Sequence, residues 1–267
     1  MLSVIKLGGS TLDGGVRPEM LAPLAAWVCA GERLVIVHGG GKTLTSLLAT
    51  LGAGTQFRQG LRVTDPPTLE AAVMALAGSV NTRLVAALNQ VLAGRRAPPR
   101  AVGLTGLDGG SLQARRLDPE LGRVGETQPA DPRLLQCLLA ADYIPVLASL
   151  APETGAPGEI LNVNADIFAS SCAALLAADR LLFVTDVPGV LDRGGRRLDV
   201  VRLAELEALQ QSGQVSGGML PKLQACRQAL AAGVAQVAIL GAAALPPRLD
   251  AEYPHTRILA SARESRV

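Results

Sequence analysis

Aromatic residues are scarce in this chain of 267 residues: tryptophan, tyrosine and phenylalanine together make up 2% of it. Proteins that hold single-stranded nucleic acids commonly stack the bases on aromatic rings, within a groove rich in basic residues. The formal net charge here is only +2, and the basic residues are dispersed along the chain. Because both the stacking rings and a phosphate-tracking surface are lacking, we expect no nucleic-acid partner.

Residues that bind metals or form disulfides are also few. The chain has two histidines and four cysteines, and no C-x-x-C pair. We therefore predict neither a metal site built from protein ligands nor a disulfide framework. Most of the cysteines sit in apolar helical patterns, which favours buried structural thiols: Cys29, Cys137, Cys172 and Cys226.

The sequence shows no targeting segment. The first stretch, "MLSVIKLGGS", reaches Lys6 and a glycine turn too early to supply the apolar core of a signal peptide. No apolar run is expected to be long enough to cross a membrane. These two observations predict a soluble, cytoplasmic protein with no membrane partner.

Apolar runs rich in valine, isoleucine and leucine alternate with helical patterns through most of the chain. Strands are expected at 3–7, 34–38, 101–104, 144–147, 181–185 and 236–240. Helices are expected at 18–30, 42–51, 67–93, 132–140, 166–178, 203–211 and 221–232. Because the strands are continuously apolar, both of their faces should be buried. The pattern predicts the α/β class: a three-layer αβα sandwich around a mostly parallel sheet.

Two segments interrupt this alternation. Residues 111–128 are expected to form a hairpin over the sheet edge, with "RRLDPELG" as its turn. The run "APETGAPGE" at 151–159 is rich in proline, glycine and acidic residues, and we interpret it as a junction within a single domain of 1–267. It would separate an N-terminal lobe, 1–155, from a C-terminal lobe, 156–267.

Glycine-rich turns follow the first two expected strands. The stretch "RLVIVHGGGKTL" is not a Walker A loop, because Ile36 stands where that loop needs its first glycine. In open parallel sheets, however, ligands bind beyond the carboxyl ends of the strands. The turns "KLGGS" and "HGGGK" would let backbone N–H groups approach phosphate oxygens there. The alternative is that both are only tight strand-to-helix turns.

Two lysines stand in unusual places. Lys6 falls within an apolar strand, where its ammonium is costly unless it meets an anion; alternatively, its stem reaches water from an edge strand. Lys222 is expected in the first turn of a helix, off the apolar face. A cation there is disfavoured by the helix dipole, which suggests a further role. The alternative is a solvated surface lysine.

Polar side chains gather in "NVNAD" and "GLRVT". Asn162, Asn164 and Asp166 alternate, so in an extended segment they point the same way, with Asp166 then capping a helix. Arg62 precedes Asp65, which should cap the long helix, and its planar fork suits a carboxylate. The alternatives are a polar turn and an ordinary surface charge.

Taken in order, "VIKLGGS", "VIVHGGGK", "GLRVT", "ALAGSVN", "AVGLTGLDG", "LGRVGE", "DYIPVLASL", "NVNAD", "FVTDVPGVL" and "GGMLPKLQAC" resemble the amino-acid kinase family over almost the whole chain. Within it, "GLRVT" together with "NVNAD" resembles the branch that phosphorylates the side-chain carboxylate of N-acetyl-L-glutamate with ATP, in arginine biosynthesis. The resemblance implies that activity here, with Mg²⁺ carried on the ATP phosphates.

The resemblance also implies roles for individual residues. Lys6 and Lys222 resemble the paired lysines that stabilise charge on the transferred phosphoryl group, and Asp166 resembles the carboxylate that holds both. Substrate binding falls to Gly40, Gly41, Arg62, Asn162 and Asn164. Binding of ATP and its phosphates falls to Gly8, Gly9, Thr185, Asp186, Gly189, Leu191, Val215 and Met219.

The end of the chain departs from the family pattern. Gly241 lacks the aspartate of the usual "DG" turn, and His255 precedes Thr256 where a Gly-Thr pair is usual. Nothing precedes the first strand, whereas arginine-inhibited hexameric members carry an extra helix there. The resemblance thus implies an arginine-insensitive homodimer, with the helix at 68–92 as its interface. The alternative is that this helix is buried within one subunit.

Two other functions compete with this interpretation. One is a kinase acting on an aminoadipate linked to a carrier protein in lysine synthesis, but "FRQGLRVTDPPT" does not supply the broad basic entrance expected for it. The other is a catalytically silent domain that only binds an amino acid or a regulator. Retention of Lys6, Asp166 and Lys222 together argues against a silent domain.

Overall fold

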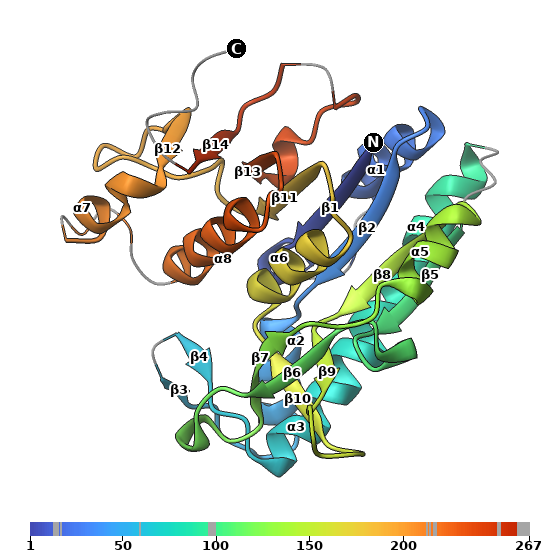
Figure 1. The fold of residues 1–267 in the computed structure, drawn as a ribbon, viewed down its shortest axis with the longest axis vertical. Helices are drawn as coiled ribbons and strands as arrows, with labels where there is room; N and C mark the ends of the chain where they lie inside the picture. Colours follow the sequence, from blue (N-terminus) through green and yellow to red (C-terminus); the bar gives the residue numbers. More distant parts are fainter. Residues whose placement is uncertain are drawn as a thin grey trace.

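The central sheet has eight strands in the order β12-β14-β13-β11-β1-β2-β8-β5 (Figure 1). The computed structural model describes residues 1–12, 16, 18–58, 60–95, 100–211, 213, 215, 218–249 and 252–260. In the described part of this sheet β13 and β14 run antiparallel, and all other neighbours are parallel. The strands are β1 (Leu2–Leu7), β2 (Arg33–His38), β5 (Arg100–Thr105), β8 (Tyr143–Ala148), β11 (Arg180–Thr185), β12 (Val200–Arg202), β13 (Gln236–Gly241) and β14 (Thr256–Leu259). The predicted, mostly parallel sheet is confirmed.

Helices cover both faces of this sheet. The helices are α1 (Pro18–Cys29), α2 (Gly41–Thr50), α3 (Pro66–Ala72), α4 (Asn81–Gly94), α5 (Arg133–Ala140), α6 (Ala165–Leu175), α7 (Leu206–Gln211) and α8 (Met219–Ala231). In β1, Val4 joins a buried cluster with α5, α6 and α8, whereas the next residue, Ile5, joins a second cluster with α1 and α4. Alternate residues of a strand point to opposite faces, so the two clusters are the two interfaces of a three-layer sandwich.

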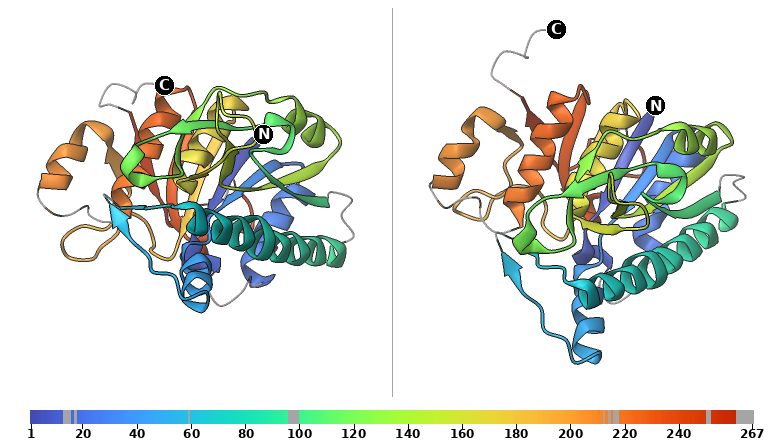
Figure 2. Two further views of the ribbon diagram at one scale, coloured as in Figure 1. Left: turned by 90° about the horizontal axis from the view of Figure 1, so that it is seen from below. Right: turned by 60° about the horizontal axis from the view of Figure 1, so that its bottom comes forward.

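The helix expected at 67–93 is continuous from Pro66 to Gly94 and runs along one side of the molecule (Figure 2). Asp65 caps it as predicted, since its Oδ1 accepts a hydrogen bond from Thr68 N at 2.9 Å. The middle of the helix, η2 (Val73–Val80), is a π-helix, which the sequence did not predict.

By length and composition alone the helix from Pro66 to Gly94 could cross a membrane, so the expectation that no apolar run is long enough is wrong. Buried core helices of soluble proteins meet the same criterion, and 44% of its most apolar window is buried in the protein.

A second, four-stranded sheet lies beside α2 and α3, in the order β6-β7-β10-β9 (Figure 1). The hairpin predicted at 111–128 is present as β6 (Gln113–Arg116) and β7 (Val124–Gln128), and it belongs to this sheet. The run at 151–159 connects β9 (Leu150–Pro152) to β10 (Ile160–Val163), which pair antiparallel. A lobe boundary after residue 155 would therefore fall inside a hairpin.

The cysteines do not all match the prediction of buried thiols. Cys172 and Cys226 are buried, but Cys29 and Cys137 are exposed, and all four are free. Cys29 ends α1, and Cys137 lies on the side of α5 that faces away from the sheet, which explains their exposure.

Candidate active site

The two glycine turns meet because β1 and β2 are neighbours and run parallel. A Cβ atom built on Gly9 would stand 3.2 Å from the backbone N of Gly41 and 3.5 Å from that of Gly40. A side chain at residue 9 would therefore cover both nitrogens. Gly40 has a second constraint, since a Cβ atom there would stand 2.7 Å from Leu76 Cδ2 on the long helix. Gly8 donates its N–H to Val184 O at 2.8 Å, which ties the first turn to β11.

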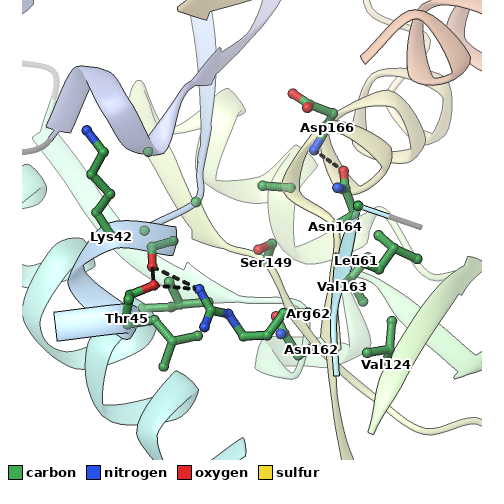
Figure 3. Close-up of a pocket in the computed structure, with 18 of the residues that line it drawn as sticks. Lys42, Thr45, Leu61, Arg62, Val124, Ser149, Asn162, Val163, Asn164 and Asp166 are labelled. Carbon is green, nitrogen blue, oxygen red and sulfur yellow. Dashed lines mark hydrogen bonds between the residues drawn. The ribbon is translucent and has the colours of Figure 1, made fainter. Parts of the chain in front are cut away.

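A cavity of about 470 Å³ opens beside these turns, between the main sheet and the second sheet (Figure 3). Eight predicted site residues line it: Lys6, Gly9, Gly40, Gly41, Arg62, Asn162, Asn164 and Asp166. They come from β1, the short helix η1 (Gly9–Leu12), β4 (Leu61–Arg62), β10, and the helices α2 and α6 with their N-cap residues. Residues more than 150 positions apart in the sequence thus share one cavity.

Lys6 and Asp166, at one end of the cavity, form a buried cluster of three charges with Lys222, which is not among the lining residues. Lys6 Nζ lies 2.8 Å from Asp166 Oδ1, and Lys222 Nζ lies 2.9 Å from the same oxygen. The three side chains are only 8–10% exposed. Lys222 was expected off the apolar face of its helix, but it is buried, and its ammonium also lies 5.3 Å from the centre of the Phe183 ring. With two ammonium groups and one carboxylate, the cluster carries an excess positive charge that an anion would compensate.

Burial and charge act in opposite directions in this cluster. Burial lowers the pKa of Lys6, and the neighbouring Lys222 ammonium lowers it further, while Asp166 and Asp186 raise it in part. For Asp166, burial alone would raise the pKa, but the Lys6 and Lys222 ammonium groups outweigh it and hold the pKa below its usual value. Asp166 is therefore an ionised counter-ion at neutral pH, as an organising carboxylate must be.

Asp166 does not cap its helix, contrary to the prediction. Asn164 is the N-cap residue of α6, and its Oδ1 accepts a hydrogen bond from Asp166 N at 2.9 Å (Figure 3). The same oxygen accepts a second hydrogen bond from Ile167 N at 3.2 Å. Because Asn164 performs the capping, the Asp166 carboxylate is available to the two lysines. The alternation had predicted a shared direction, and all three polar residues of "NVNAD" do line the cavity.

The other end of the cavity holds Arg62. Its Nη2 donates to Thr45 Oγ1 at 2.8 Å and to Gly41 O at 3.1 Å (Figure 3). Its Nη1 donates to Thr55 Oγ1 at 3.0 Å. The guanidinium also lies 4.8 Å from the centre of the Phe57 ring. No carboxylate takes part in these contacts, so the guanidinium keeps its charge available to a ligand. Asn162 lies nearby on β10, where its Nδ2 donates to Thr64 Oγ1 at 3.2 Å.

The residues predicted to bind the nucleotide lie outside this cavity, apart from Gly9. Thr185 ends β11, and Asp186, Gly189 and Leu191 follow it in the chain. Gly189 has a φ of 151°, and a Cβ atom there would stand 2.4 Å from Thr256 Oγ1. Val215 is buried, and Met219 begins α8. Residues 212, 214, 216 and 217, within the expected turn before α8, lie outside the described residues.

Sequence reasoning missed several residues at the site. Thr45 stands one helical turn after Gly41, on the helix that follows the second glycine turn, and this spacing could have identified it. Ser149 also lines the cavity, but no motif marks it. Thr256 had been noted only as a departure, yet its hydroxyl accepts from Val190 N at 3.0 Å and donates to Leu198 O at 2.6 Å. It thereby holds the turn that contains Gly189.

Possible protein ligands for a metal lie scattered over the residues that the structure describes. Within those ranges, no group of three or more His, Cys, Asp or Glu side chains could hold a metal ion.

Comparison with known proteins gave consistent matches. The model of the amino acid kinase family matches residues 1–241. The acetylglutamate kinase of Solibacter usitatus is 44% identical over 245 residues, which cover 91% of this chain and 92% of the relative. The acetylglutamate kinase of Acidobacterium capsulatum is 44% identical over 250 residues, with the same coverage. Among solved structures, N-acetylglutamate synthase from Neisseria gonorrhoeae superposes with a TM-score of 0.83 at 26% identity, covering 98% of this chain and 62% of that one.

Proposed function

Since this chain belongs to the amino acid kinase family, we propose that it transfers the γ-phosphoryl group of ATP to the side-chain carboxylate of N-acetyl-L-glutamate. The product would be N-acetyl-L-glutamyl 5-phosphate, an intermediate of arginine biosynthesis. The observation that carries the proposal is the buried Lys6–Asp166–Lys222 cluster at one end of a cavity whose other end presents Arg62. The names of relatives that share 44% of their residues with this chain support the same activity.

In this mechanism a carboxylate oxygen of the acceptor attacks the γ-phosphorus, and the bond to the β-phosphate oxygen breaks as ADP leaves. The acceptor is already ionised at neutral pH, so no base is needed. Lys6 and Lys222 would face the equatorial oxygens of the moving phosphoryl group from two sides and stabilise their charge. Asp166 would hold both ammonium groups in place without touching the substrate.

The acceptor would lie along the cavity. The fork of Arg62 suits its α-carboxylate, and Asn162 and Asn164 lie where amide groups could meet its acetamido group. Gly40 and Gly41 begin α2, and the first N–H groups of a helix have no partner within it, so they are available to an anion.

ATP would approach from the other side of the cluster. Gly8 and Gly9 would face its phosphates, while the residues after β11 and before α8 would hold the nucleoside: Thr185, Asp186, Gly189, Leu191, Val215 and Met219. Mg²⁺ prefers oxygen ligands and would be carried by the ATP phosphates.

Assembly and location belong to the same proposal. The helix from Pro66 to Gly94 leaves residues such as Met74 exposed, at 55%, and this exposed side would form the interface of a cytoplasmic, arginine-insensitive homodimer. An N-terminal lobe would bind the acceptor and a C-terminal lobe would bind ATP. Because Asn162 and Asp166 lie after the boundary at 155, the acceptor site would also use residues from the C-terminal part of the chain.

The test is ATP-dependent acyl-phosphate formation, trapped with hydroxylamine, with N-acetyl-L-glutamate, L-glutamate and aminoadipate derivatives offered separately. Product with N-acetyl-L-glutamate alone is the expected result. Product only with a carrier-linked aminoadipate would replace this function with its lysine-pathway counterpart. Absence of product with every acceptor, together with absence of ATP binding, would indicate a silent amino-acid-binding domain.

A further inference from the structure

His38 ends β2 and is fully buried beside the cavity. Its Nδ1 lies 2.9 Å from Gly39 O, and its Nε2 lies 2.9 Å from Asn81 Nδ2. The same Asn81 nitrogen lies 2.9 Å from Val146 O, the backbone carbonyl of a residue in β8. One imidazole thus connects the second glycine turn to the long helix and, through it, to the central sheet.

These contacts determine the tautomer of His38. A backbone carbonyl can only accept, so the Asn81 atom facing Val146 O must be the amide nitrogen. That nitrogen has two hydrogens and donates one to Val146 O and one to His38 Nε2. Nε2 must then carry no proton, which places the single proton on Nδ1, where it is donated to Gly39 O.

Gly103 on β5 makes this arrangement possible. A Cβ atom on Gly103 would stand only 2.1 Å from Asn81 Oδ1, so any other residue at 103 would displace the amide. Asn81 is itself the first residue of α4, directly after the π-helical segment η2. Sequence motifs marked neither residue for a function.

The hydrogen bond from His38 controls a peptide plane at the cavity. The described residues contain no cis peptide bond, and in a trans peptide the C=O of Gly39 and the N–H of Gly40 point in opposite directions. Fixing the carbonyl therefore fixes the direction of the Gly40 N–H, which belongs to the N-cap residue of α2 and has no partner within that helix.

From this geometry, and resting on the proposed kinase function, we propose that His38 is a positioning residue. Supported by Asn81 and Gly103, it holds the Gly39 carbonyl so that the Gly40 N–H is oriented for the phosphoryl group in the transition state. His38 acts without transferring a proton.

The surroundings keep the imidazole neutral. Burial is the main cause that lowers the pKa of His38 to about 4; the hydrogen bond to the Gly39 carbonyl opposes this shift, and the nearby Lys6 ammonium adds to it. A neutral ring is required for the role, because a proton on Nε2 would remove the acceptor for Asn81.

Two substitutions at residue 38 test the contacts of the two imidazole nitrogens one at a time. In His38→Asn the amide nitrogen takes the place of Nδ1 and retains a donor for Gly39 O. In His38→Gln the terminal amide takes the place of Nε2, so the contact with Asn81 is retained and the donor is lost. We expect His38→Asn to retain a kcat within about threefold of the original, and His38→Gln to lose at least about tenfold in kcat with little change in KM.

Equal loss in both variants, or a kcat retained in His38→Gln, would overturn the proposal, because a purely structural role does not depend on which nitrogen is kept. Gly103→Ala should lower kcat in the same way by displacing Asn81, and it decides the question if His38→Gln does not fold. Gly94→Ala is its control, since a Cβ there meets nothing within 4 Å.

Two-bond ¹H–¹⁵N spectra of the unmodified protein provide a test that needs no activity. A neutral ring protonated on Nδ1 at pH 7 is expected, and a cationic ring or a proton on Nε2 would refute the positioning role. If N-acetyl-L-glutamate is not phosphorylated while the spectra show the expected tautomer, the proposed function fails and the hydrogen-bond chain stands.

Discussion

The two ends of the cavity hold positive charge by different means. At the Lys6–Asp166–Lys222 end, the charges are almost entirely buried, and two ammonium groups share one carboxylate oxygen. At the Arg62 end the guanidinium is half-buried and held by neutral oxygens from two threonines and a glycine carbonyl. Buried charges respond strongly to a change in a neighbour, whereas a half-exposed one is partly screened by water. The first end suits a charge that moves during a reaction, and the second suits a charge that stays in place.

The sharpest way to test this contrast is Lys222→Ala. If Lys222 acts mainly in the transition state, kcat should fall by about 10²–10³-fold while the KM for the acceptor changes little. Arg227→Ala, on the exposed side of the same helix, is the matched control. Steady-state kinetics measure both, and near-normal turnover of Lys222→Ala would remove it from the mechanism.

Asp166→Asn should destabilise the folded protein at the Lys6–Asp166–Lys222 end of the cavity. Two buried ammonium groups would lose their counter-ion, which costs about 3–5 kcal/mol in the free energy of unfolding. The pKa of Asp166 is lowered in the folded protein, so its stabilisation is complete above the unfolded value of about 3.9 and is lost as the pH falls through the folded value. Urea denaturation of both proteins from pH 7 downward should show the difference narrowing under acid conditions. A difference that does not change with pH would contradict the role of counter-ion.

Arg62→Ala should affect the Arg62 end of the cavity, and it should do so only by weakening the binding of the acceptor. Loss of a charged hydrogen-bonding group is worth about 1.5–3 kcal/mol, so the KM for the acceptor should rise by about 10–100-fold with kcat nearly unchanged. Arg62→Lys should recover part of the affinity, because it keeps the charge and loses the fork. A fall in kcat without a rise in KM would show that the two ends do not divide their roles in this way.

Thr45→Val should have the smallest effect. It removes one neutral acceptor from the Arg62 guanidinium while keeping the shape of the side chain, and one such hydrogen bond contributes about 0.5–1.5 kcal/mol. The KM for the acceptor should rise by about 2–10-fold, with no change in kcat. In the Arg62→Ala background the same substitution should have no further effect, which a double-mutant cycle would measure.

The sequence predicted the α/β fold well because every predicted strand of the main sheet is a continuous apolar run. It also indicated Lys6, since a charge within such a run is costly. The short strands β12 and β14 carry no comparable pattern, and they were not predicted. The role of Asp166 as a helix cap was wrong because Asn164, two residues earlier, caps equally well and only the chain path decides between them. His38 and Asn81 lie 43 positions apart, so their contact follows from the packing of the long helix on the sheet.

The sharing of Asp166 by two lysines has a consequence for the order in which the protein is synthesised. Lys6 and Asp166 are both present once two-thirds of the chain has left the ribosome, and by themselves they form a neutral pair. Lys222 arrives on α8, near the end of the chain, and its docking adds the uncompensated charge. A nascent chain can therefore assemble the first part of this site as a neutral pair, and the second ammonium group is added only when α8 is in place.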